Sequence, residues 1–276
     1  MKRLAAVVTA CAAMLAVPAS SQAIVNGTAD GGAHPNVGAL TVQYQGSQVL
    51  ACTGTLISPT VLVTAAHCTA QLEQLGFSQT SVSFDTNIGS GSDITCGLID
   101  CYVQPAAKSL HVGTLHTNPR FSGSTAGVDS HDVAVVTFNK PIKGITPGSL
   151  PPAGLLDNMA SDETFASQTF TNVGYGWHAV VSNGRNFAGL FDGVRRYATS
   201  GSQSLNTSDL KLTENATLGF GGACSHDSGG PAFVGTGGVI AGEVSALQDD
   251  CDSTYILYRL DTDSARSFLA DYVSLP

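Results

Sequence analysis

The chain has little charge, no long apolar run after its first residues, and few segments that could form long amphipathic helices. Only 12% of its 276 residues are charged, and the formal net charge is −9. Such a surface gives no reason to expect nucleic acid or an anionic membrane as a partner. Because no later segment is long enough to cross a bilayer, a membrane-spanning protein is not predicted. Internal repeats and low-complexity segments are also absent.

The residues that are present favour a fold rich in β-strands. Hydrophobic residues make up 43% of the chain, which is enough for a substantial core. Glycine, serine and threonine are frequent, as is typical of β proteins with many turns. Apolar, β-branched segments bounded by turn residues predict strands at 37–44, 49–57, 61–64, 133–138, 170–176 and 238–245. Residues 264–273 predict a helix, with Phe268, Leu269, Tyr272 and Val273 on one face.

Residues 1–23 have the pattern of a secretory signal peptide. Lys2 and Arg3 precede a short apolar run, and Ser21-Gln22-Ala23 suits a signal-peptidase site. Cleavage after Ala23 would make Ile24 the first residue of the secreted protein. Cleavage after Ala19 is the alternative, and it would leave a short pro-segment. Val8 to Cys11 loosely resembles a lipidation box, but apolar sequence continues past it.

The cysteine count agrees with export. Besides Cys11 the chain has six cysteines, and an even number in an exported protein indicates disulfide bridges. Spacing alone leaves 15 pairings open. The six are Cys52, Cys68, Cys96, Cys101, Cys224 and Cys251.

Three separate segments hold the residue types of a nucleophilic triad. Asp227-Ser228-Gly229-Gly230-Pro231 places one serine among small residues, and such a hydroxyl needs a base to become a nucleophile. Ala65-Ala66-His67-Cys68 offers the base, and Asp132 opens an apolar strand from which it could orient that base. The order His, Asp, Ser is one of the recurrent orders of serine triads.

Together these segments resemble the chymotrypsin/trypsin-like serine protease family. The resemblance implies an all-β fold of two antiparallel six-stranded β-barrels packed together, with a C-terminal helix. We expect a protease domain over 24–276, with barrels at about 24–140 and 155–262, a linker at about 141–154, and the helix at about 263–273. It also implies His67 as base, Asp132 as its orienting group and Ser228 as nucleophile, with Ser245 as a candidate hydrogen-bond donor to Asp132.

The same resemblance implies disulfide pairs, partners and a state of assembly. The bridges would be Cys52–Cys68 and Cys224–Cys251, which leaves Cys96 to pair with Cys101. Protein or peptide substrates are expected, protein protease inhibitors are possible partners, and the protein should be a monomer. No cofactor and no metal are expected.

The oxyanion hole departs from the family pattern. The resemblance assigns its two donors to the backbone N–H groups of His226 and Ser228, where the family usually has glycine in place of His226. A side chain there resists left-handed backbone angles, at about 1–2 kcal/mol. We interpret His226 as a tolerated, solvent-facing side chain, so its replacement by glycine should leave activity unchanged or raise it. The alternative is a tuned or weakened hole.

The resemblance also assigns an activation pair and a specificity pocket. Asp227 would pair with the amine of Ile24, because a buried carboxylate needs a partner. Gly222 stands at the floor of the pocket, and no acid is there to bind Arg or Lys. Leu247 forms one wall, and either Tyr255 or Ile256 forms the other. Bulky walls predict a shallow apolar pocket.

These features predict a secreted serine endopeptidase that cuts after small or apolar residues through an acyl-enzyme. Two other functions fit the same residues. A protease-like binding protein could have kept the fold and lost turnover, and an esterase could use the same triad.

Overall fold

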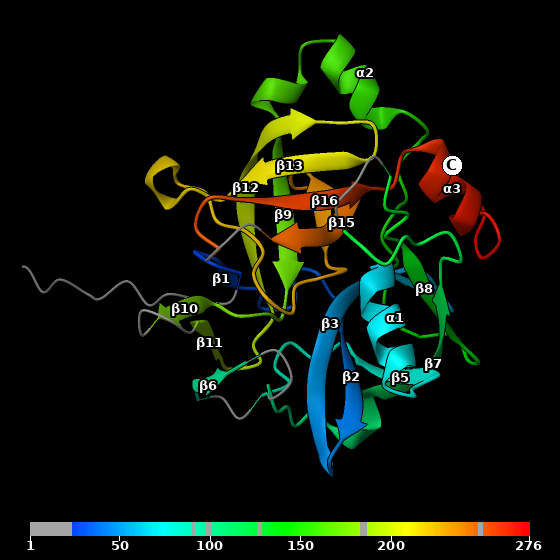
Figure 1. Cartoon of the computed structure of the whole chain (residues 1–276), viewed down its shortest axis with the longest axis vertical. Helices are drawn as coiled ribbons and strands as arrows, with labels where there is room; N and C mark the ends of the chain where they lie inside the picture. The colour runs from blue at the N-terminus through cyan, green and yellow to red at the C-terminus, as the bar shows by residue number, and fades with distance from the viewer. Residues whose placement is uncertain (1–23, 90–91, 98–100, 126–128, 183–186, 248–250) are drawn as a thin grey trace, which may run out of the picture.

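The computed structural model describes residues 24–89, 92–97, 101–125, 129–182, 187–247 and 251–276. The expected signal peptide, residues 1–23, lies outside the described residues. Within the described chain, no helix has the length and apolar character needed to cross a membrane. Figure 1 shows two groups of strands, one above the other, with the C-terminal helix at the side.

The first group is a closed antiparallel barrel in the order β2-β3-β4-β8-β7-β5. Its core is apolar and fully buried, with Leu40, Leu62 and Val136 among its members. Its strands are β2 (Val37–Tyr44), β3 (Ser47–Ser58), β4 (Val61–Thr64), β5 (Gln79–Ser83), β7 (Leu110–Thr117) and β8 (Ala134–Phe138).

The second group is also a closed barrel, because β12 pairs with both β13 and β9. The short strand β1 (Thr28–Ala29) adds to β12 from outside the ring. The six strands of the ring are β9 (Thr169–Gly174), β12 (Arg196–Leu205), β13 (Asp209–Thr213), β14 (Pro231–Val234), β15 (Ile240–Leu247) and β16 (Thr254–Arg259). The predicted fold of two six-stranded barrels with a C-terminal helix is therefore confirmed.

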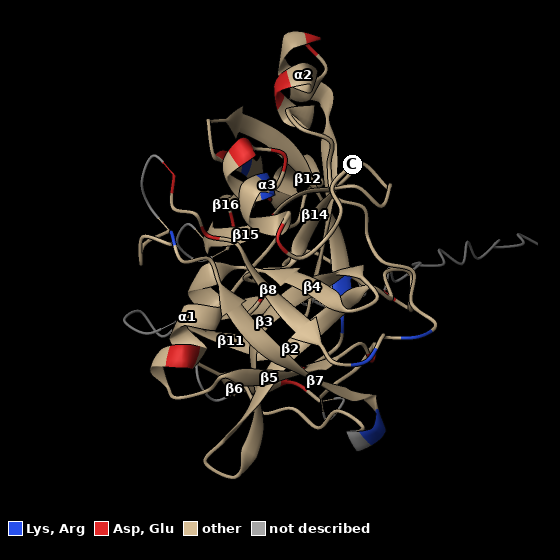
Figure 2. Cartoon of the chain, turned by 90° about the vertical axis from the view of Figure 1, so that its right-hand side faces the viewer, with Lys and Arg blue, Asp and Glu red and all other residues tan. Residues whose placement is uncertain are grey.

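The helices are few and short. They are α1 (Ala66–Gln74), α2 (Leu155–Ser161) and α3 (Asp263–Leu269), with 3₁₀ turns at Ala107–Ser109, Phe165–Ser167 and Ala216–Leu218. Thr262 caps α3 by accepting the N–H of Ala265. This helix ends four residues before the predicted Val273, and beyond Leu269 the N–H groups of Asp271 and Tyr272 bond only three residues back, to Phe268 and Leu269. Figure 2 shows acidic residues on all three helices and few basic residues on the visible face.

A third, three-stranded sheet was not expected from the sequence. It has the order β10-β11-β6, with β6 (Ile94–Cys96), β10 (Ala179–Ser182) and β11 (Phe187–Phe191). Cys96 pairs with Gly189 across β6 and β11. The sheet therefore joins a segment that leaves the first barrel to a hairpin that lies between β9 and β12 of the second.

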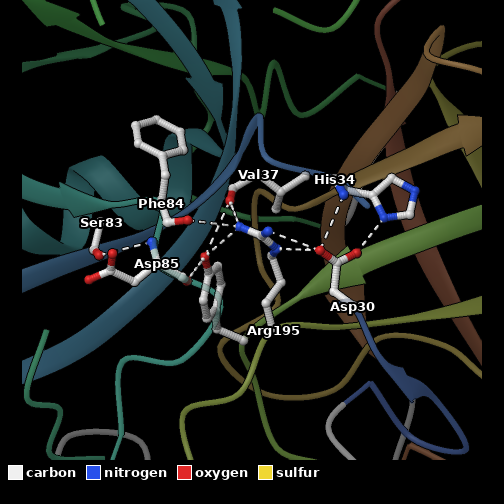
Figure 3. A network of polar contacts seen from close by, with 8 residues as sticks. Asp30, His34, Val37, Ser83, Phe84, Asp85 and Arg195 are labelled. Atoms are coloured by element: carbon white, nitrogen blue, oxygen red, sulfur yellow. Dashed lines mark hydrogen bonds and ion pairs between the residues drawn. The ribbon is translucent and has the colours of Figure 1, made fainter. Parts of the chain in front are cut away.

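A buried ion pair ties the N-terminal segment to both barrels (Figure 3). Arg195 is 1% exposed and its guanidinium contacts Asp30 at 2.9 Å. The same guanidinium donates to the carbonyls of Val37 and Phe84, at 2.9 and 3.1 Å. Burial alone would raise the pKa of Asp30, but bonds from His34 and the charge of Arg195 lower it to about 2. The stabilisation from the ionised carboxylate is thus complete above about pH 4 and is lost as the pH falls towards 2.

Arg195→Met should destabilise the fold by about 3–5 kcal/mol at neutral pH, because Asp30 would stay buried without its counter-charge. Denaturant unfolding of the purified protein measures this loss. Arg120→Met removes an exposed arginine and should change stability by no more than about 0.5 kcal/mol. The double variant Asp30→Asn/Arg195→Met should be more stable than Arg195→Met alone. Equal effects of Arg195→Met and Arg120→Met would contradict the role given to the ion pair.

Candidate active site

The structure brings His67 and Asp132 together from two parts of the first barrel. β4 leads directly into α1, whose second residue is His67, while Asp132 lies just before β8. The Asp132 carboxylate accepts the backbone N–H of His67 at 2.8 Å and lies 2.9 Å from its Nδ1. Asp132 is fully buried, and the His67 side chain is 24% exposed. With Nδ1–H donating to Asp132, Nε2 of a neutral ring becomes the basic nitrogen.

The Asp132 carboxylate has one further donor and one acidic neighbour. Ser245 donates to Oδ2 at 2.5 Å, so the serine singled out from the sequence does contact the aspartate. The neighbouring His131 instead lies 2.7 Å from Ser264 and does not compete for this position. Burial, together with the negative charge of Asp132, raises the pKa of Glu243 well above its usual range. The sequence analysis missed Glu243, since an isolated acid in a strand is ordinarily exposed.

Ser228 lies on a tight loop that the first barrel holds in place. Its carbonyl accepts the N–H of Thr53 in β3 at 2.9 Å. The next residue, Gly229, has a φ of +76° and packs so closely that a Cβ there would lie 2.8 Å from the nitrogen of Ala65. The loop therefore reaches the segment just before His67. The hydrogen bonds of the described residues do not include one from Ser228 to His67, and such bonds are often long before substrate binds.

The two peptide groups that would form the oxyanion hole have defined orientations. The carbonyl of Ser225 accepts the N–H of Trp177 at 2.9 Å, and the carbonyl of Asp227 accepts the N–H of Gly230 at 2.8 Å. Both peptides are trans, so each N–H points opposite to its carbonyl. The N–H groups of His226 and Ser228 are thus turned away from Trp177 and Gly230.

His226 has a left-handed backbone, with φ at +72°. Its side chain is not solvent-facing, so that interpretation was wrong: the residue is only 6% exposed. The ring lies against Trp177 and the sulfur of Cys101, neither of which neighbours it in the sequence. The burial was not predictable from local spacing, because 125 positions separate Cys101 from His226.

Asp227 is completely buried in the turn before Ser228. Its carboxylate accepts the N–H groups of Gly176 and Cys224, at 2.8 and 2.9 Å. Burial outweighs these bonds and raises the pKa of Asp227 to about 7. Ile24, its expected partner, is 1% exposed. The next residue, Val25, accepts the N–H of Gly222 at 3.0 Å. The segment that starts at Ile24 is therefore inserted beside the site.

The candidate specificity pocket is filled at its floor. A Cβ on Gly222 would lie 2.5 Å from the ring of Tyr255 and 2.6 Å from the carboxylate of Glu214. Tyr255 is fully buried, with its hydroxyl 2.7 Å from Ser200. Tyr255 is thus the residue beside Gly222, while Ile256, its neighbour in β16, points to the opposite face. Leu247 pairs with Tyr255 at the end of β15.

All six expected cysteines are bridged as the resemblance implied: Cys52–Cys68, Cys96–Cys101 and Cys224–Cys251. An apolar cavity of about 180 Å³ lies beside the first bridge, lined also by Leu50, Leu72 and Leu75. It does not include Gly222 or Tyr255, so it is separate from the candidate specificity pocket.

Among the described residues, two groups could offer metal ligands. One includes Cys52 and Cys68, which are bridged and therefore not available as thiolates. The other is Asp93, His178 and Asp192, whose ligand atoms lie within 4.8 Å of one another. Asp192 already binds Arg196 through both carboxylate oxygens at 2.7 Å, which weakens the case for a cation there.

Comparison with known proteins agrees with this fold. The family model described as Trypsin matches residues 24–265. A trypsin of Phaedon cochleariae is 29% identical over 221 residues, covering 74% of this chain and 71% of that protein. The solved structure of HL collagenase superposes with a TM-score of 0.61 at 18% identity, covering 89% of this chain and 95% of that one. The similarity to the collagenase structure shows a shared fold only.

Proposed function

Because the chain belongs to the trypsin family of serine peptidases, we propose that it is a secreted endopeptidase that uses Ser228, His67 and Asp132. The observation that carries this proposal is the buried Asp132 carboxylate bound to Nδ1 of His67 beside the Ser228 loop. Secretion is supported by the three bridges and by the export pattern of residues 1–23. Protein or peptide substrates follow from the family.

The proposed reaction has two acyl-transfer steps. His67 Nε2 takes the proton of the Ser228 hydroxyl as the oxygen attacks the peptide carbonyl carbon. The oxyanion formed is stabilised by the N–H groups of His226 and Ser228. The C–N bond then breaks as His67 protonates the leaving amine, and an acyl-enzyme remains. Water, deprotonated by the same nitrogen, releases the acid and restores the serine. Asp132 keeps the proton on Nδ1 and stabilises the imidazolium form.

Ser228 is a better nucleophile candidate than the other serine near the pocket. Ser200 is fully buried, donates its hydroxyl to the carbonyl of Gly221, and also contacts Tyr255. A serine with this burial cannot meet a polypeptide substrate. Ser228 is half-buried and lies on the loop that approaches His67.

We expect substrates with small apolar residues before the cut bond. The space at Gly222 is taken by Tyr255 and Glu214, which leaves little depth for a long side chain. A long side chain, including lysine or arginine, would have to displace Tyr255 or Glu214 from this space.

Ser228→Ala should abolish labelling by a fluorophosphonate and reduce hydrolysis by at least about a thousandfold, because the attacking oxygen is removed. Ser200→Ala is the matched control and should keep its labelling. Unchanged labelling of Ser228→Ala would exclude the proposed nucleophile. Cleavage of protein or peptide substrates by the unlabelled wild type separates a peptidase from an esterase.

Cleavage of a peptide library should show Ala or Val before the cut bond in preference to Arg or Lys, by about tenfold or more in kcat/KM. One extra or missing methylene in an apolar pocket already changes kcat/KM by about tenfold. Tyr255→Ala should open the floor and shift the preference towards longer apolar side chains, whereas Ile256→Ala should not. A wild-type preference for basic residues would refute the shallow pocket.

We also propose that signal cleavage after Ala23 creates the active amino terminus. In the chain that still has residues 1–23, Ile24 has no free amine. The raised pKa of Asp227, about 7, then means that stability falls as the pH rises from about 4 to 7, by roughly 4 kcal/mol. In the form that begins at Ile24, the amine should pair with Asp227 and remove this fall.

Mass spectrometry of the secreted protein and unfolding at pH 4 and 7 test this maturation route. The processed form should begin at Ile24 and be active at once. A first residue of Ser20 with an inactive product would show that a second cleavage is needed. Asp227→Asn in the unprocessed chain should also remove the pH dependence.

A further inference from the structure

The side chain of His226 lies in a buried position formed by residues distant in the sequence. Its Nε2 is 3.3 Å from the sulfur of Cys101 and 3.3 Å from the carbonyl of Gly97. Its Nδ1 is 3.3 Å from the carbonyl of Ala51. The centre of the Trp177 ring is 6.1 Å away. Contacts at both ring nitrogens and with Trp177 therefore fix the position of the imidazole.

The surface that holds His226 is itself firmly attached. The carbonyl of Cys101 accepts the N–H of Leu50, and Val103 donates its N–H to Gln48, both at 3.0 Å. The bridge from Cys101 to Cys96 anchors the segment to β6. β3 of the first barrel and β6 of the small sheet thus fix the position of the sulfur against which the ring packs.

Trp177 connects this surface to the backbone of the oxyanion loop. Its indole Nε1 donates to the sulfur of Cys101 at 3.4 Å, while its backbone N–H donates to the carbonyl of Ser225 at 2.9 Å. The Ser225–His226 peptide is thus held at one end by Trp177 and at the other by the seated imidazole. A rotation of this peptide would have to break the bond to Trp177 and move the ring out of its site.

We propose that His226 is a positioning residue: its buried ring, seated on Cys101 and Trp177, fixes the Ser225–His226 peptide so that its N–H can serve the oxyanion hole. This proposal rests on the proposed peptidase function. It reverses the expectation that glycine at this position would leave activity unchanged or raise it. Glycine would relax the left-handed φ of +72°, but it would also free the peptide to rotate.

The direct test compares His226→Gly with wild type in kcat, KM and melting temperature. An oxyanion donor acts on the transition state, so kcat should fall about tenfold to a hundredfold while KM changes less than about twofold. Glu163→Gly is the matched control, since Glu163 also has a positive φ, +58°, and is exposed far along the chain from the site. It should keep the wild-type kcat. An unchanged kcat in His226→Gly would overturn the proposal.

A second comparison tests whether the disulfide Cys96–Cys101 affects kcat through its contact with His226. Cys96→Ser/Cys101→Ser should lower kcat in the same way, and adding His226→Gly to it should give little further loss. If the two losses in kcat multiply in the combined variant, the disulfide and His226 act independently of each other. If His226→Gly does not fold, His226→Asn replaces it, because asparagine tolerates a left-handed backbone but is too short to reach Cys101.

A crystal structure of His226→Gly tests the proposal without an activity measurement. The bond from Trp177 N–H to the Ser225 carbonyl should be lost or the peptide reversed. If the bond is kept, the ring does not fix the peptide and the proposal fails. Failure of the peptidase function would look different: the wild type would then cleave no peptide, whatever the peptide group does in His226→Gly.

Discussion

The arrangement of the site depends on one buried carboxylate, that of Asp227. Its oxygens accept N–H groups from Gly176 and from Cys224, so one side chain fixes two separate loops. Gly176 comes just before Trp177, whose backbone orients the Ser225 peptide. Asp227 is also the residue before Ser228. The candidate oxyanion donors and the candidate nucleophile therefore lie on a turn whose geometry depends on the N–H groups that this buried carboxylate binds.

The parts of the site that could be predicted are those determined by local sequence. Small residues around Ser228, an aspartate at the start of an apolar strand, and a histidine after β4 are visible without coordinates. The contacts of Asp132 with His67 and Ser245 agree with what the family resemblance of these segments implied. Local patterns also located six of the twelve barrel strands, namely β2, β3, β4, β8, β9 and β15, because alternation and β-branching reflect the pleat itself.

The parts that could not be predicted depend on contacts between distant segments. The burial of His226 requires Cys101, and the choice of Tyr255 over Ile256 requires the pairing of β15 with β16. A one-residue shift in that pairing would reverse which side chain faces Gly222. Glu214, just after β13, and Glu243, in β15, were missed for the same reason, since such a glutamate shows no sign of burial until the sheet around it is known.

The small sheet β10-β11-β6 has a consequence for how the molecule holds together. The pairing of β6 with β11 at Cys96 and Gly189 joins a segment from the first half of the chain to one from the second half. The guanidinium of Arg195 adds hydrogen bonds to the carbonyls of Val37 and Phe84. The barrels are thus cross-connected at sites other than the segment between β8 and β9 that joins them in sequence. A nick in that segment would leave two fragments bound to each other, and neither half on its own would be a self-sufficient folding unit.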